Sequence, residues 1–340
     1  MSFPSVETRL TRSPATAAAA LRDGGRVVFP TETVYGLGAD AFDAEAVRGI
    51  FEAKGRPADN PLIVHVAATE AIQRVARLVP PAAERLVEQF FPGPLTLVLP
   101  RRTELPSVVT AGLDTVGVRM PRLPLARCFL EACATPVAAP SANLSGRPSP
   151  TTWQAARDDL DGRVECILQG PRTEAGLEST VVDCTDADDP LHVLRAGATP
   201  LEALRAALPD VPVHPPAVSS GEASSGKASS ENEAAAPRSP GTRHRHYAPD
   251  ARVLVVDGPQ TAVPAPGERR AYIGLAAPAD LDAFAPVRVC ENVEMYARAL
   301  FAFFRQADAA GCDVIYAQAV AETGLGRALM DRLRRAADAA

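Results

Sequence analysis

Short apolar runs alternate with amphipathic stretches along roughly the first 200 residues. Compact runs rich in Val, Leu and Ile and bounded by Gly or Pro predict β-strands, whereas apolar positions three or four residues apart predict helices. The predicted strands are 26–30, 62–66, 95–99, 116–120, 137–139, 166–169, 179–183 and 191–195, and the predicted helices are 43–53 and 82–90. This alternation predicts a mixed α/β domain, with prolines punctuating its loops.

The pattern changes twice after this region. From 211 to about 241 the chain is rich in Pro, Ser, Ala and Glu, and such a segment buries too little apolar surface to offset its ordering entropy. Beyond it, strands are predicted at 253–256, 270–274, 287–290 and 314–316, and helices at 294–309 and 325–337. We therefore predict a catalytic domain at 1–210, a linker or lid at 211–249 and a small Rossmann-like α/β domain at 250–340. The small domain carries no GxGxxG dinucleotide motif.

Composition narrows the class of protein. The net charge is −6 and acidic and basic residues are nearly balanced in both halves, which argues against a non-specific nucleic-acid binder. No run of 18 uncharged apolar residues is present, and the N-terminus lacks an apolar export segment, so we expect a cytoplasmic protein with no membrane contact. Six cysteines without a CxxC pair indicate reduced core thiols, and no metal site is predicted.

One lysine stands out because the chain otherwise uses arginine as its cation. Of 35 basic residues only Lys54 and Lys227 are lysines, and Lys227 lies in the low-complexity linker. Lys54 instead stands in the triplet Lys54-Gly55-Arg56, followed by a Pro-containing loop. An ammonium group beside a forked guanidinium suits a polyphosphate, although the triplet is not a Walker A loop. A chance surface lysine is the alternative.

Polar residues follow several of the other predicted strands. The segment 30–38 combines hydroxyls with Gly36 and Gly38, which suits either a ligand loop or a simple turn. His65 ends a strand, where it either binds a substrate carboxylate or is structural. Arg119 lies in an apolar strand and requires an anion, which a substrate or an internal salt bridge supplies equally well.

Further hydroxyls, an amide and a cation lie at 140–146, 178–183 and 195, while arrangements typical of nucleophilic catalysis are missing. A basic and aromatic cluster at 240–249 is either a functional segment or a solvated charge run. The chain is thus rich in groups that bind phosphate and carboxylate. Catalysis by positioning and charge neutralisation is the reaction type that these residues favour.

Taken in order, the motifs PTETVYGLGAD, KGRP with a following NPL, FPGPLT, VGVRMP, PSANLSG, STVVD and LRAGA resemble the YrdC-domain family of threonylcarbamoyl-AMP synthases. The resemblance covers roughly residues 10–205. The later PGTRHRHYAP and the C-terminal region resemble the linker and extra domain of the long, two-domain form. The family's fold is a twisted α/β sheet around a cationic cavity.

The resemblance implies an activity and its substrates. Members make L-threonylcarbamoyladenylate and pyrophosphate from L-threonine, bicarbonate and ATP with Mg²⁺, as the first step toward threonylcarbamoyladenosine (t6A) in tRNA. A downstream tRNA threonylcarbamoyltransferase complex is the implied partner.

The family's site residues carry over to positions that match its motifs. Lys54 and Arg56 would be catalytic, and Tyr247 would close over the nucleotide as part of a lid. Those implied to bind L-threonine are Tyr35, His65, Arg119, Ala139 and Ser179. Those implied to bind ATP are Lys54, Arg56, Asn60, Thr115, Ser141, Ser149, Arg195 and Tyr247, while Thr31 and Asn143 would line the cavity.

Two other functions are compatible with parts of these motifs. The hydrogenase-maturation carbamoyltransferase shares a YrdC-like region, but the zinc-binding cysteine pairs of that protein are missing here. A double-stranded RNA or tRNA-binding module without synthase activity is the alternative from a different class. The balanced charge and the lack of interleaved aromatic and basic residues speak against tight RNA binding.

Overall fold

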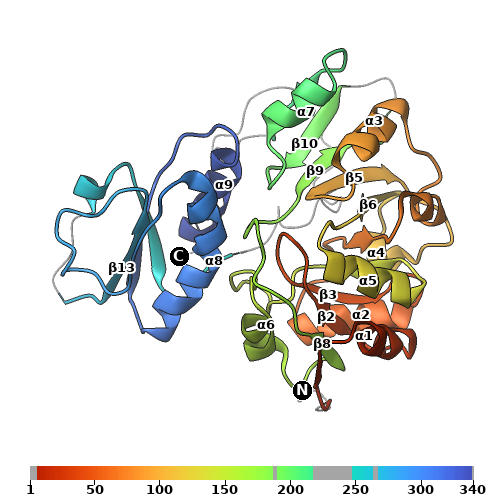
Figure 1. Ribbon diagram of the computed structural model, residues 1–340, viewed down its shortest axis with the longest axis horizontal. Helices are drawn as coiled ribbons and strands as arrows, with labels where there is room; N and C mark the ends of the chain where they lie inside the picture. The colour runs from red at the N-terminus through yellow and green to blue at the C-terminus, as the bar shows by residue number, and fades with distance from the viewer. Residues whose placement is uncertain (1–5, 187–189, 217–246, 263–266, 339–340) are drawn as a thin grey trace.

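Two β-sheets of very different size organise the computed structural model, which describes residues 6–186, 190–216, 247–262 and 267–338. The larger sheet has eleven strands in the order β1-β8-β2-β3-β7-β4-β6-β5-β9-β10-β11 and mixes parallel with antiparallel pairs. The smaller has four strands in the order β12-β15-β13-β14, all parallel. Figure 1 shows the smaller sheet and its two helices beside the larger domain. The predicted combination of a mixed α/β domain and a small α/β domain is confirmed.

The strands of the larger domain are β1 (Arg9–Thr11), β2 (Val27–Phe29), β3 (Gly36–Asp40), β4 (Ile63–His65), β5 (Leu95–Pro100), β6 (Thr115–Arg119), β7 (Val137–Ala139), β8 (Cys166–Leu168), β9 (Thr180–Asp183), β10 (Leu191–Arg195) and β11 (Val213–His214). Its helices are α1 (Pro14–Arg22), α2 (Ala44–Lys54), the 3-10 helix η1 (Thr69–Arg74), α3 (Pro81–Phe90), α4 (Ser107–Thr110), α5 (Pro124–Cys133), α6 (Trp153–Leu160) and α7 (Leu201–Ala207). Every strand predicted in this part of the chain is present to within one residue at each end.

The smaller domain contains β12 (Arg252–Val256), η2 (Pro259–Thr261), β13 (Arg270–Gly274), β14 (Val287–Val289), α8 (Val293–Ala309), β15 (Val314–Gln318) and α9 (Gly326–Ala337). All of its elements except the short η2 were predicted from the apolar pattern. Most of the linker, residues 217–246 with Lys227 and His244, lies outside the described residues. No helix in the described ranges is long and apolar enough to cross a membrane.

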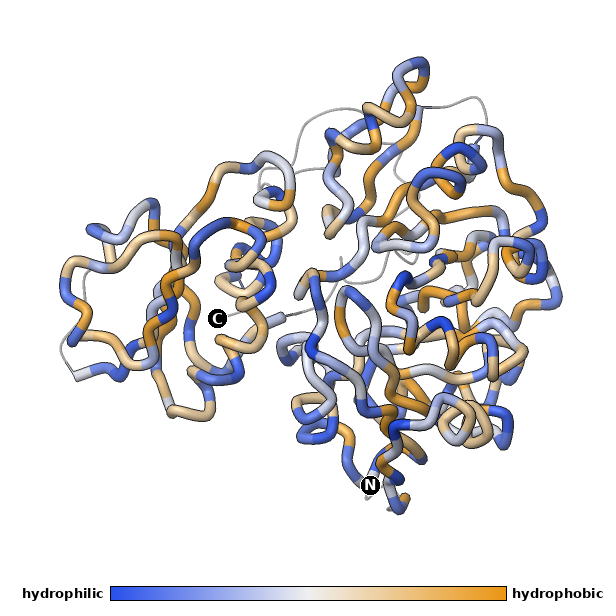
Figure 2. The backbone as a smooth tube through the Cα atoms, in the orientation of Figure 1, coloured by the Kyte–Doolittle hydropathy of each residue, from blue (hydrophilic) through white to orange (hydrophobic). Residues whose placement is uncertain are grey.

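The strands of the larger domain are mostly buried and apolar, and several polar residues lie at the strand ends. Figure 2 shows hydrophobic residues concentrated along the strands and the helix faces that cover them. The parallel pairing of β4 with β6 puts His65 next to Arg119, the last residue of each strand. Two residues that are 54 positions apart in sequence therefore meet at one edge of the core.

The segment 36–40 was predicted as part of a loop, but it forms strand β3. The prediction relied on Gly36 and Gly38 as turn residues, whereas both lie in extended backbone between β2 and β7. A Cβ atom added to Gly38 would come within 2.6 Å of Val137 and 2.9 Å of Phe29. These glycines are needed because neighbouring side chains cross the strand closely, not because the chain turns there.

The smaller domain packs directly on the larger one through α8 and α9 (Figure 1). Its hydrophobic core extends into the larger domain and includes Val34, Leu177 and Ala196. Gly176, with φ of 75°, lies so close to α8 that an added Cβ would be 2.4 Å from the Cα of Arg298. The two domains therefore meet in a close-packed apolar contact.

Candidate active site at the domain contact

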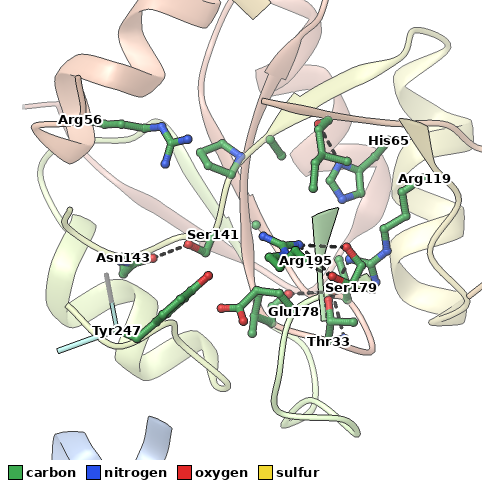
Figure 3. A pocket seen from close by; sticks show the side chains of 16 residues that line it. Thr33, Arg56, His65, Arg119, Ser141, Asn143, Glu178, Ser179, Arg195 and Tyr247 are labelled. Carbon is green, nitrogen blue, oxygen red and sulfur yellow. Dashed lines mark hydrogen bonds between the residues drawn. The ribbon is translucent and has the colours of Figure 1, made fainter. Parts of the chain in front are cut away.

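A polar cavity opens where the strand ends of the larger domain meet Tyr247, near the C-terminal end of the linker. Its volume is about 650 Å³ when the mouth to solvent is included. In Figure 3, Arg56, Ser141, Asn143 and Tyr247 lie on one side, and His65 and Arg119 on the other. The lining residues are Thr31, Thr33, Val34, Gly36, Arg56, Ile63, His65, Arg119, Ala139, Pro140, Ser141, Asn143, Glu178, Ser179, Arg195 and Tyr247.

Arg119 is buried and fully oriented by its neighbours. Its Nη2 donates to Oε1 of Glu32 at 2.6 Å, its Nη1 donates to Oγ1 of Thr33 at 2.8 Å, and its Nε donates to the carbonyl of Gly93 at 3.3 Å. Glu32 is completely buried. The internal salt bridge that the sequence left open is thus present, and it fixes the plane of the guanidinium at the cavity wall.

His65 presents a neutral imidazole beside this guanidinium. Burial, together with the nearby positive charge of Arg119, lowers the pKa of His65 to about 3. Its Nδ1 lies 3.2 Å from the carbonyl of Ile63, and its ring meets that of Phe29 edge-on at 5.6 Å between centroids. The imidazole is therefore an uncharged hydrogen-bonding group at neutral pH.

The depressed pKa of His65 predicts a specific loss of stability in mild acid. Because the unfolded chain protonates this histidine near pH 6.5 and the folded chain only near pH 3, stability falls as pH drops between these values. From pH 7 to pH 5 this one group should cost about 2 kcal/mol of unfolding free energy. Urea unfolding of wild type and His65→Asn at several pH values measures it. Parallel pH dependences of the two proteins would contradict the prediction.

Arg195 and Ser179 form a second ordered cluster in the cavity. The guanidinium of Arg195 donates from Nε and Nη2 to the carbonyl of Ser179 at 3.2 and 3.0 Å, and Nη2 reaches the hydroxyl of Ser179 at 3.2 Å. That hydroxyl lies 2.8 Å from the hydroxyl of Thr96. Burial lowers the pKa of Arg195, but the group remains cationic because an arginine starts far above neutral pH.

Arg56 points into the cavity from the loop after α2. Its Nη2 donates to the carbonyls of Asn60 and Pro61 at 3.2 and 3.3 Å, while its Nε has no partner among the described residues. Burial lowers the pKa of Arg56 to about 10, which leaves it charged at neutral pH. This guanidinium is held by two carbonyls and keeps further N–H groups for a ligand.

Lys54 lies behind the cavity wall and is not among the lining residues. The last residue of α2, it is buried and donates from Nζ to the carbonyl of Ser141 at 2.5 Å and to the carbonyl of Asn143. Burial lowers the pKa of its ammonium well below the ordinary value. Its visible contacts therefore hold the 141–143 loop, whereas the sequence had suggested direct contact with phosphate.

Four other predicted site residues also lie outside the lining set. The hydroxyl of Tyr35 donates to the carbonyl of Pro171 at 2.9 Å, and burial raises its pKa. The hydroxyl of Ser149 donates to Oε1 of Glu178 at 2.6 Å. Asn60 is buried, and neither of its side-chain polar atoms has a partner in the part of the chain that the structure describes, while Thr115 is half-buried at the start of β6. Their proposed roles in substrate binding remain predictions.

Tyr247 closes one side of the cavity and is held in place by contacts from both domains. It is buried, adopts a positive φ of 68° and stacks on Phe301 of α8 at 5.4 Å between centroids. Cζ of Arg332 from α9 lies 5.0 Å from the ring centre. The backbone of the next residue, Ala248, donates to the carbonyl of Gly146 at 3.0 Å. This aromatic wall thus depends on contacts from two separate domains.

Two polar residues that line the cavity were not predicted from the sequence. Thr33 orients Arg119, and Glu178 carries the one carboxylate among the lining residues that the structure describes. Glu178 stood in the recognised stretch 178–183, but only the hydroxyls of that stretch were considered. A carboxylate directly before the predicted strand 179–183 was the available signal.

Models of known families divide the chain into two matches. Residues 19–197 match the Sua5, YciO and YrdC family, described as "Telomere recombination". Residues 200–338 match the family described as "Threonylcarbamoyl-AMP synthase, C-terminal domain". The second match includes α7 and β11 of the larger domain together with the small parallel sheet.

Relatives with known names cover nearly the whole chain. The threonylcarbamoyl-AMP synthase of Pyrococcus abyssi is 45% identical over 94% of this chain and 92% of its own length. That of Bacillus subtilis is 41% identical over 95% and 92%. The crystal structure of P. abyssi Sua5 complexed with L-threonine superposes with a TM-score of 0.84 at 42% identity, covering 98% of both chains.

Fold and cavity together define a two-domain α/β protein with a polar cavity at the contact between its domains. The matches extend across both parts. The chain belongs to the threonylcarbamoyl-AMP synthases, in the two-domain Sua5 form that joins a YrdC domain to a Sua5 C-terminal domain. The resemblance found in the sequence motifs is confirmed, and with it the class of nucleotidyltransferase and the link to t6A modification of tRNA.

Proposed function

We propose that this cavity joins L-threonine, bicarbonate and ATP into L-threonylcarbamoyladenylate, releasing pyrophosphate. The observation that carries the proposal is the convergence of Arg56, Arg119 and Arg195 on one cavity from three separate parts of the chain. Three guanidinium groups against one carboxylate give the lining a positive excess, which suits a site that gathers anionic substrates.

We assign the end of the cavity around Arg119 to L-threonine. Three of the five N–H groups of Arg119 are occupied by protein, which leaves two for the carboxylate of the amino acid. Neutral His65, the backbone of Ala139 and the hydroxyl of Ser179 surround the same space. Tyr35 lies outside the lining set and would support the threonine end from behind the cavity wall. The threonine-bound structure of the P. abyssi relative supports the choice of amino acid.

We assign the opposite end to ATP. Arg56, Ser141, Arg195 and Tyr247 line this end or its junction with the amino-acid end (Figure 3). Lys54 supports it by holding the carbonyls of the 141–143 loop, and Asn143 lines the same wall. Tyr247, which belongs to the linker at 211–249 and lines this end, would act as the lid that closes over the nucleotide.

The residues also suggest how the reaction proceeds. The amine of threonine adds to bicarbonate with loss of water and gives a carbamate. A carbamate oxygen then attacks the α-phosphorus of ATP while the bond to the leaving pyrophosphate breaks. Arg56 would neutralise the charge that develops on pyrophosphate, and Arg119 would hold the amino acid in place for attack. A closed Tyr247 would exclude water from the labile product.

Mg²⁺ is proposed to arrive with ATP and not to occupy a site of the protein. The single lining carboxylate, Glu178, already accepts from Ser149 and from Arg332 at 2.6 and 2.8 Å. The described residues contain no cluster of three metal-ligating side chains. Phosphate oxygens and water are the usual ligands of Mg²⁺ in nucleotide sites, and the metal would help to neutralise pyrophosphate.

We propose that residues 1–210 form the catalytic domain, that 211–249 act as linker and lid, and that 250–340 form the domain against which the lid docks. We also propose a cytoplasmic location and delivery of the adenylate to a tRNA threonylcarbamoyltransferase complex. Direct tRNA binding is the alternative function.

A reconstitution assay tests the proposed reaction. The purified chain is incubated with ATP, L-threonine, bicarbonate and Mg²⁺, while pyrophosphate release and the adenylate mass are recorded. We expect the adenylate only when all three substrates are present. Pyrophosphate release that ignores bicarbonate would refute the reaction. Salt-sensitive binding of tRNA tighter than binding of ATP would instead favour the RNA-binding alternative.

A further inference from the structure

Helix α9 of the C-terminal domain sends an arginine into the wall of the catalytic cavity. Arg332 is completely buried, and it has the largest side chain among the fully buried residues. Its Nε donates to Oε2 of Glu178 at 2.8 Å and its Nη2 donates to the carbonyl of Ala196 at 3.0 Å. Asp331 accepts from its Nη1. A fully buried guanidinium is costly unless its partners are fixed, so this contact constrains both domains.

Apart from Asp331 on its own helix, the hydrogen-bond partners of Arg332 lie at or next to the cavity lining. Glu178 lines the cavity and directly precedes Ser179, while Ala196 directly follows Arg195. The guanidinium also lies over the ring of Tyr247 at 5.0 Å. Arg332 therefore connects the two strand ends of β9 and β10 with the aromatic wall.

The charge of Glu178 is the reason that this contact matters for binding. Burial would raise the pKa of Glu178, but the charges of Arg332 and Arg195 and hydrogen bonds from Ser149 and Arg332 keep it below the ordinary value. The carboxylate is therefore ionised inside a cavity that would receive ATP and the carboxylate of threonine. Without a partner it would repel both substrates through a medium that screens charge poorly.

The other ion pairs between the domains differ from this one. Arg327 meets Glu202 at 3.4 Å on the surface, and Arg305 meets Asp159 at 2.7 Å. None of these four residues lines the cavity. They hold the domains together, whereas the pair of Arg332 and Glu178 also sets the charge of the substrate site.

We propose that Arg332 is a positioning residue of the synthase site. By pairing with Glu178 it cancels the carboxylate in the cavity wall, and by stacking on Tyr247 it holds the aromatic wall in place. Docking of the C-terminal domain thereby converts the cavity into a form that accepts ATP. This inference rests on the proposed binding of ATP in the same cavity.

A double-mutant cycle in the full-length chain tests the charge argument. Arg332→Met leaves Glu178 unpaired, and we expect KM for ATP to rise about 10- to 100-fold, as a unit charge roughly 5–10 Å from the phosphates would produce. Adding Glu178→Gln removes the carboxylate and should recover most of that loss. Arg332→Lys keeps the charge and should lie between wild type and Arg332→Met.

Arg327→Met is the matched control because it breaks an ion pair between the same two domains away from the cavity. We expect its KM for ATP to stay within about twofold of wild type, as a surface pair contributes little. Circular dichroism and urea unfolding ensure that all variants are compared in the folded state. A purely structural role for Arg332 would lower stability without a selective change in KM for ATP.

The outcomes separate this inference from the proposed function. If the wild type forms no bicarbonate-dependent adenylate, the proposed reaction fails. If the wild type is active but Arg332→Met has the same KM for ATP as Arg327→Met, only the role of Arg332 fails. Failure of Glu178→Gln to restore KM in the double variant would likewise overturn the charge argument.

Discussion

Replacing Arg119 by methionine should lower the free energy of unfolding by about 3–5 kcal/mol, because it leaves the buried carboxylate of Glu32 without its partner. The same change removes the proposed anchor for the carboxylate of threonine. We therefore expect turnover to be lost even under conditions where the variant is folded. Urea unfolding measures the first effect, and isothermal titration with L-threonine measures the second.

The double variant Glu32→Gln/Arg119→Met separates these two effects. Glutamine removes the uncompensated charge, so much of the lost stability should return. Threonine binding should not return, because the guanidinium is still missing. Recovery of threonine binding in the double variant would show that Arg119 supports the fold alone.

Replacing Arg56 by methionine should reduce kcat/KM for ATP about 10- to 150-fold with little change in stability. Within the described ranges the guanidinium donates hydrogen bonds to two carbonyls at 3.2 and 3.3 Å, and its Nε has no hydrogen-bond partner there. A charge-assisted hydrogen bond to phosphate is worth about 1.5–3 kcal/mol, which corresponds to that range. Steady-state kinetics with ATP as the varied substrate checks it.

Lys54→Met provides the contrast. Its ammonium holds two carbonyls of the 141–143 loop from within the protein, so its loss leaves those carbonyls unsatisfied. We expect stability and activity to fall together, unlike in Arg56→Met. Equal stability of the two variants would place Lys54 on the substrate instead of behind the wall.

The apolar pattern was sufficient to predict most strands, because a buried strand is a short, uninterrupted run of apolar residues in the sequence. Strand β3 was missed for a physical reason. Its glycines are required by the side chains of Phe29 and Val137, which cross it from neighbouring strands. Such crossings join residues far apart in the sequence, and a local pattern carries no record of them. Helices α6 and α7 were missed because they have only eight and seven residues, which leaves little room for a helical repeat of apolar positions. Helix α5 was also missed, although Leu125, Phe129 and Leu130 give it an apolar face.

The site was partly predictable for the same reason. The strand-end positions of His65 and Arg195 followed from the predicted strands, whereas Arg119 was predicted within a strand and proves to be its last residue. The ion pairs at the cavity could not be predicted from the sequence, because their partners lie far apart along the chain. Glu32 is 87 positions from Arg119, and Glu178 is 154 positions from Arg332. Nor could the burial of Lys54 be predicted, because a triplet of sequence cannot show which side of a loop faces the ligand.

The shared apolar core has a consequence for the separability of the domains. Val34, Leu177 and Ala196 of the larger domain are packed among side chains of α8 and α9. A chain cut before residue 250 would leave these positions, along with the inner edge of the cavity, facing water. Such a fragment would gain an adhesive surface beside its active site and would tend to self-associate. In the full-length chain, the C-terminal domain covers these apolar side chains.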